Sequence, residues 1–145
     1  MQHAIQAENE LAHTVIGLAI EIHKALGPGL TEDAYRDCLM YELKEHGIFA
    51  EAGKMMPVQY KNLQLNYGYK VDLLVEGKLV VEIETVEQIS DNQVQLLLRH
   101  LKTGGFKLGL IINFNSVLLK NGIRRVTNHR PAGEEERSIL EESVL

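Results

Sequence analysis

The stretch Tyr69-Lys-Val-Asp-Leu-Leu-Val-Glu-Gly-Lys-Leu-Val-Val-Glu-Ile-Glu84 contains two apolar segments of strand length on either side of a turn. The Glu76-Gly77 pair predicts a β-hairpin, because glycine accepts the positive φ that tight hairpin loops require. Three carboxylates interrupt the apolar segments: Asp72 in the first, and Glu82 and Glu84 in the second. Carboxylates are costly to bury, so these positions indicate either a solvated face of the sheet or a metal site.

The length of the hairpin loop decides whether Asp72 and Glu82 can share a metal. Directly opposed residues of an antiparallel pair lie on the same face of the sheet. A two-residue loop at Glu76-Gly77 would place Asp72 opposite Val81 and turn Glu82 to the other face. A loop that also includes Lys78 would place Asp72 opposite Glu82. A shared metal site therefore predicts the three-residue loop.

The same register would place Glu84 opposite Lys70. One interpretation is a cross-strand ion pair at the rim of the sheet. The other is that Lys70 supplies an amine close to the carboxylates. Solvated carboxylates on an exposed face also remain an interpretation for Asp72 and Glu82.

The segments around the hairpin predict an α/β fold with a mixed sheet flanked by helices. Three segments carry apolar residues every three or four positions, which is the period of a helix: 8–26, 31–46 and 89–103. Further strands are predicted at 56–60, 107–114 and 123–127. The segment 107–114 is apolar almost throughout, as expected for a strand covered on both faces.

Length and composition predict one globular domain. The chain has 145 residues, of which 45% are hydrophobic and 24% charged. We expect this domain to span residues 1–130, followed by a weakly structured tail, 131–145, whose end could form a short helix. The net charge of −5 gives no overall basic field, so nucleic-acid binding would need a local basic face.

The single cysteine, Cys38, excludes an intramolecular disulfide and a cysteine-based zinc cluster, and we expect it inside a helix as a buried thiol. No apolar run reaches the roughly 18–20 residues that a membrane span needs, and no signal-peptide pattern opens the chain. A cytoplasmic protein without membrane contact is the expectation.

Several separated motifs resemble one protein family. Gly29-Leu-Thr-Glu32-Asp-Ala-Tyr35 matches the pattern G-x-x-E-x-x-Y. Four more segments fit in the same order, 20–30, 69–75, 107–115 and 118–126. Over about residues 15–126, the chain resembles the GxxExxY proteins, a group within the PD-(D/E)XK nuclease superfamily.

This resemblance implies a restriction-endonuclease-like sheet core with a divalent-metal site for Mg²⁺ or Mn²⁺. Glu32 would join Asp72 and Glu82 as metal ligands, and nucleic acid would be the partner. Together with Lys70, which the hairpin register places opposite Glu84, Asp72, Glu82 and Glu84 would form the catalytic set. Mg²⁺ keeps several waters, so two or three carboxylates suffice to hold it. The metal would lower the pKa of a bound water for hydrolysis of a phosphodiester.

The chain departs from the family pattern at three positions. Glu84 occupies the place of a lysine, which puts an anion where a phosphate must approach. On the helix at 89–103, Gln93 and Leu96 stand where the pattern resembles His-x-x-Gln. Some restriction endonucleases of the superfamily, however, have glutamate at the lysine position.

Four functions therefore remain open. The chain is a metal-binding nuclease-like protein whose catalysis Glu84 compromises, or an active Mg²⁺-dependent nuclease or phosphodiesterase that acts on DNA or RNA. Alternatively, it is a silent member of the fold that binds nucleic acid, a protein partner or a second copy. The fourth is a different metal-binding role, since an extra carboxylate makes the site more anionic and could favour a Ca²⁺- or Mn²⁺-like ion.

The remaining polar residues have structural interpretations. His23 and Tyr35 lie on or beside apolar helix stripes, so we expect them to be buried and hydrogen-bonded. His46, His100 and His129 show no ligand spacing. The most basic region, either a solvated surface or a phosphate-binding rim, consists of Lys102, Lys107, Lys120, Arg124 and Arg125.

Overall fold

A computed structural model describes residues 5–129 of the chain. Its helices and strands follow one another as α1 (Gln6–Leu26), α2 (Glu32–Glu45), β1 (Ala50–Tyr60), β2 (Leu63–Val75), β3 (Leu79–Glu84), α3 (Asp91–Gly104), β4 (Leu108–Asn113), the short 3₁₀ helix η2 (Leu119–Gly122) and β5 (Ile123–Thr127). The five strands form one sheet in the order β1-β2-β3-β4-β5. β3 and β4 are parallel and the other neighbours antiparallel, so the predicted mixed α/β sheet is confirmed.

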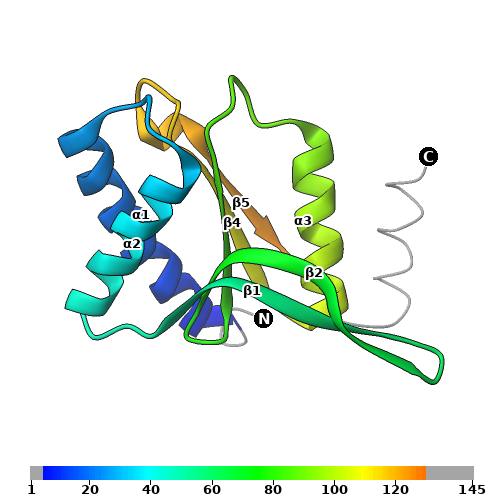
Figure 1. Cartoon of the computed structure of the whole chain (residues 1–145). Coiled ribbons are helices and arrows are strands. Elements are labelled where there is room, and N and C mark those ends of the chain that lie inside the picture. The colour runs from blue at the N-terminus through cyan, green and yellow to red at the C-terminus, as the bar shows by residue number, and fades with distance from the viewer. Residues whose placement is uncertain (1–4, 130–145) are drawn as a thin grey trace.

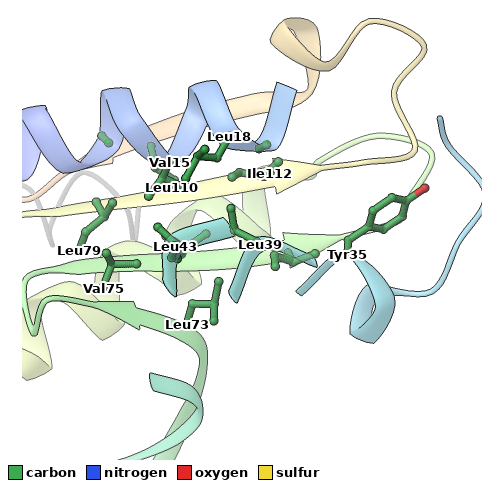
Figure 2. Close-up of a cluster of buried hydrophobic side chains, with 14 of the residues drawn as sticks. Val15, Leu18, Tyr35, Leu39, Leu43, Leu73, Val75, Leu79, Leu110 and Ile112 are labelled. Carbon is green, nitrogen blue, oxygen red and sulfur yellow. The ribbon is translucent and has the colours of Figure 1, made fainter. Parts of the chain in front are cut away.

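The sheet separates two layers of helices (Figure 1). α1 and α2 cover one face, and α3 covers the other. The larger core lies under α1 and α2 and contains Leu39, Leu79 and Leu110 among others (Figure 2). The smaller core lies under α3 and includes Val80 and Leu97. All six residues of β4 are buried, as the apolar composition of 107–114 predicts.

The β2–β3 hairpin has the register that a shared site requires. Leu73 pairs with Val81, and Val75 pairs with Leu79. The loop therefore contains three residues, with positive φ at Glu76 (53°) and Gly77 (65°). Continued by one residue, this register places Asp72 opposite Glu82. The prediction of the three-residue loop is confirmed.

The first strand is longer than the sequence indicates and bends near its start. β1 begins at Ala50 rather than at residue 56 and pairs with β2 along its whole length. Gly53, with φ 59°, stands between the pairs Ala52–Leu73 and Lys54–Val71. A glycine inside a strand often marks a bend, because it accepts a conformation that other residues avoid.

The bend turns the outer half of the β1–β2 hairpin toward α3. Val71 and Leu74 both pack into the core under α3, although an odd separation on a regular strand would place them on opposite faces. A second irregularity follows, since Met56 pairs with Tyr69 but Val58 pairs with Leu65. Figure 1 shows the hairpin turn projecting beyond the helices.

Cys38 is a free thiol on α2, but it is only partly buried. The expected tail at 131–145, with its short helix, lies outside the described residues. Across residues 5–129, the longest helix is not apolar enough to cross a membrane.

Candidate carboxylate site

Asp72 and Glu82 lie on neighbouring strands, on the face of the sheet that α3 covers. Alternation along β3 places Glu82 on the side of Val80, and the Asp72 carboxylate is close enough to interact with it. The Asp72 carboxylate accepts a hydrogen bond from the backbone N–H of Ile83, with 2.8 Å between Oδ2 and N. This bond fixes Asp72 beside Glu82. Both side chains are half-buried.

Glu82 is the most perturbed acid in the described part of the chain. Its Oε2 atom is buried and has no hydrogen-bond partner. Burial raises the pKa of Glu82 to about 9, and the neighbouring negative charge of Asp72 contributes in the same direction. An acid in this position either keeps its proton or requires a positive charge beside it.

Glu84 and Glu32 extend the group of carboxylates. Glu32, at the first position of α2, accepts a hydrogen bond from the backbone N–H of Thr85 at 3.3 Å. Burial raises the pKa of Glu84 to about 6, and the charges of Glu32 and Asp72 act in the same direction. Side chains from α2, β2 and β3 therefore meet at one end of β3, and we call Glu32, Asp72, Glu82 and Glu84 the carboxylate cluster.

Tyr35 holds the loop that precedes Glu32. Its side chain is completely buried, and its hydroxyl donates to the Gly27 carbonyl at 2.5 Å and accepts from the Leu30 N–H at 3.2 Å. Its ring stacks on Phe114 with 4.3 Å between the ring centroids. The N–H of Phe114 donates in turn to the carbonyl of Glu84 at 2.9 Å. Tyr35 thus connects the start of α2 to the end of β3.

A small cleft between β3 and α3 opens beside the cluster. Its volume is about 60 Å³. The lining residues are Glu82, Glu84, Gln93, Leu96, Leu97, His100 and Ile111. Gln93, Leu96 and His100 follow the spacing of one helix face, so α3 presents all three to the carboxylates. Leu96 is 54% exposed, so an apolar side chain stands at the mouth of the cleft.

His100 belongs to the cleft, which sequence reasoning missed. Its ring stacks on Tyr69 with 4.2 Å between centroids, and burial lowers the pKa of His100. The sequence contains an indication of this position: His100 follows Gln93 by seven residues, which is two helical turns, so both lie on the same face of the helix.

The sequence profile of the PD-(D/E)XK nuclease superfamily matches residues 9–126, which include the whole carboxylate cluster. The chain belongs to the PD-(D/E)XK nuclease superfamily. Neither the search of curated proteins nor that of solved structures found a match. Nucleases of this superfamily generally use divalent metals, and membership suggests a nucleic-acid substrate. The narrower resemblance to GxxExxY proteins stays a prediction.

The sequence prediction assigns Asp72 and Glu82 to the acids of a D…(D/E)-x-K signature, with Glu84 at the position of the lysine. Lys70 does not compensate for this replacement in the structure. It pairs with Met55 across the β1–β2 ladder, its side chain is exposed, and it forms no ion pair with Glu84. The β2–β3 ladder ends at the pair Leu73–Val81, so the pairing on which the expectation rested does not extend to Lys70 and Glu84.

The other predicted residues have structural partners. His23 is buried, and its Nε2 atom lies 2.7 Å from the Ser116 carbonyl oxygen, as expected for a packing role. The basic residues of α3 and β5 do not share one environment: the Lys102 ammonium is buried, and the Arg125 guanidinium donates to Asn9. These two side chains therefore do not supply a continuous phosphate-binding rim.

The carboxylate cluster fits a hard divalent cation in its chemistry. All of its donors are oxygens, which Mg²⁺ and Mn²⁺ prefer, and the buried Oε2 of Glu82 lacks a partner. Within residues 5–129, however, no three Asp, Glu, His or Cys side chains already converge as a ready ligand set. Asp72 and Glu82 would be the first ligands, and Glu32 would approach from α2.

Proposed function

We propose that this chain is a nuclease-like protein that binds Mg²⁺ or Mn²⁺ through Asp72 and Glu82, with Glu32 as a third ligand, and that Glu84 compromises hydrolysis. The observation that carries the proposal is the buried, unpartnered Oε2 of Glu82 next to the Asp72 carboxylate. Two half-buried carboxylates in contact repel each other unless a proton or a cation lies between them. A divalent cation bound between them would offset the repulsion between the two carboxylates.

The chain's own groups would orient the ligands. The Ile83 N–H holds Asp72, and the Thr85 N–H holds Glu32. When bound, the cation would supply a Lewis acid and a water of lowered pKa. Mg²⁺ tolerates few protein ligands because it keeps several waters, so this ligand set is sufficient.

Glu84 is the reason to expect weak hydrolysis. The superfamily signature has a lysine there, which would attract a phosphate, whereas the carboxylate of Glu84 repels it. Two unit charges about 4 Å apart interact by about 4 kcal/mol at an effective dielectric constant near 20. Each 1.4 kcal/mol changes a rate about tenfold, so the exchange of sign is enough to suppress cleavage strongly.

The alternative is an active Mg²⁺-dependent nuclease or phosphodiesterase that acts on DNA or RNA. His100 favours it, because this imidazole lines the same cleft as Glu82 and Glu84 and can donate a hydrogen bond. In that case His100, rather than a lysine, would face the phosphate.

Metal binding is tested by calorimetric titration of the metal-free protein with MnCl₂ and MgCl₂. We expect wild type and Glu87→Gln to bind alike, because Glu87 is an exposed carboxylate outside the cluster. Asp72→Asn should lose most of the affinity. Absence of metal binding by the folded wild type at millimolar concentration would overturn the proposal.

Hydrolysis is tested on single- and double-stranded DNA and on RNA with Mg²⁺. Glu84→Lys is compared with wild type and with Glu87→Lys, which makes the same charge change outside the cluster. Cleavage by Glu84→Lys alone supports a compromised site. Equal cleavage by wild type and Glu84→Lys supports the active-nuclease alternative, and no cleavage by Glu84→Lys refutes the role given to Glu84.

A further inference from the structure

The outer half of the β1–β2 hairpin has a composition unlike the rest of the chain. We call residues 54–70 the arm. The arm contains three lysines, Lys54, Lys61 and Lys70, and no aspartate or glutamate, whereas the whole chain has a net charge of −5. Lys54 forms an ion pair with Glu51, just outside the arm, with 2.9 Å between Nζ and Oε2. Lys61 and Lys70 therefore carry the local positive charge of the arm, in contrast to the negative charge of the whole chain.

Two aromatic side chains stand exposed on the arm. Tyr60 is 62% exposed and Tyr67 is 68% exposed. The Lys61 ammonium lies 5.3 Å from the centroid of the Tyr60 ring, so a cation and an aromatic face occur together at the hairpin turn. Large aromatic residues at exposed strand positions contribute little to the stability of a monomer, and beside cations they offer surfaces on which nucleobases stack.

The base of the arm contacts His100 of α3, one of the residues that line the cleft beside the carboxylate cluster. Tyr69 stacks on His100, and its hydroxyl donates to the His100 carbonyl at 3.1 Å. Asp72 follows only three residues later on the same strand. From Gly53 to the turn the arm is about 26 Å long at about 3.3 Å per strand residue, so it extends from the carboxylate cleft toward solvent.

We propose that the arm binds single-stranded nucleic acid. Bases stack on Tyr60 and Tyr67, Lys61 and Lys70 contact phosphates, and the strand continues along the arm toward the cleft between β3 and α3. Binding by the arm does not require the metal. Only the delivery of the strand to the cleft rests on the proposed function.

A single strand fits the arm better than a duplex or a protein. Stacking on a tyrosine ring requires an unpaired base with a free face, and a duplex offers such faces only at its ends. A second copy of this chain is the competing occupant, because Leu63 at the same turn is also exposed. Residues 54–70 contain no aspartate or glutamate, and this feature favours a polyanion over a second copy of the chain.

The test is fluorescence anisotropy with a labelled oligothymidylate of about a dozen nucleotides, a length within the range of single-strand binding sites. The full chain is titrated in EDTA at low salt, so that neither metal nor cleavage contributes. We expect Tyr60→Ala and Tyr67→Ala each to weaken binding by roughly 5- to 150-fold. Lys61→Ala should lower the slope of log affinity against log salt by about 0.7.

Matched controls separate the arm from general effects. Tyr41 is 64% exposed on α2, in the opposite layer, so Tyr41→Ala removes a tyrosine of equal exposure and should bind as wild type does. Tyr60→Phe keeps the ring and should retain affinity. Unchanged circular dichroism of each variant confirms that it is folded.

Three results would overturn the proposal: no binding of the single strand, equal affinity for a duplex of the same length, or unchanged affinity when both arm tyrosines are replaced. A dimer that dissociates in Tyr60→Ala, with no oligonucleotide binding, would assign the arm to a second copy. Binding in EDTA without metal affinity would retain the arm and refute the metal site, so the two failures are distinguishable.

Discussion

Replacement of Glu82 by glutamine should stabilise the metal-free protein at neutral pH. Glutamine keeps the shape of the side chain and is neutral, so it does not have to take up a proton on folding as Glu82 does beside Asp72. The pKa of Glu82 is about 9 in the folded protein, against 4.5 in an unfolded chain. A folded-state pKa above the unfolded one means that folding is most favoured below pH 4.5 and loses stability as the pH rises toward 9.

The size of this effect follows from the interval between 4.5 and the working pH. At pH 7 the interval is about 2.5 pH units, and each unit corresponds to about 1.36 kcal/mol. Glu82 therefore lowers the free energy of unfolding by up to about 3 kcal/mol at pH 7. We expect Glu82→Gln to recover most of this amount at pH 7 and to match wild type near pH 4.

Urea denaturation in EDTA at several pH values measures the difference. Glu87→Gln is the control, because it removes an exposed carboxylate and should change stability by less than about 0.5 kcal/mol. Addition of Mg²⁺ should stabilise wild type and not Glu82→Gln, since ligand binding to the folded state alone raises its stability. A variant that is no more stable than wild type at pH 7 would refute the account of Glu82 as a buried acid that lacks a cation.

Three further substitutions test other contacts. Tyr35→Phe removes the hydroxyl that hydrogen-bonds Gly27 and Leu30, so it should lower the free energy of unfolding in urea by about 1–3 kcal/mol. It should also weaken Mn²⁺ binding. An equally destabilised variant remote from the cluster should bind Mn²⁺ normally. Gly53→Ala forces a side chain into positive φ and should lower the thermal midpoint, at a cost of about 1–2 kcal/mol; an unchanged midpoint would refute the bend as a strained position. Leu96→Gln changes an exposed residue, so its stability should stay within about 0.5 kcal/mol, and in combination with Glu84→Lys it should increase cleavage of a nucleic acid above that of Glu84→Lys alone.

The hairpin register was predictable because one physical condition fixes it. Asp72 and Glu82 can face each other only across a three-residue loop, and the Glu76-Gly77 sequence tolerates the positive φ of that loop. The early part of β1 was not predictable, because Ala50-Glu-Ala-Gly-Lys54 has weak strand character and becomes a strand by pairing with β2. His100 was missed because its role depends on which face of α3 lies over β3, and this follows from packing between distant segments.

The motif Gly29-x-x-Glu32-x-x-Tyr35 and the acids of the hairpin are parts of one arrangement. Tyr35 fixes the loop before α2 and stacks on Phe114, and these contacts hold Glu32 at the end of β3. Much of this region therefore serves to keep like charges close, which a fold does not sustain without a proton or a cation. Glu84 adds another negative charge to the cluster and does not replace any of the proposed metal ligands. We therefore expect the replacement of lysine to leave cation binding intact and to act on the step that follows, the approach of a phosphate to the bound metal.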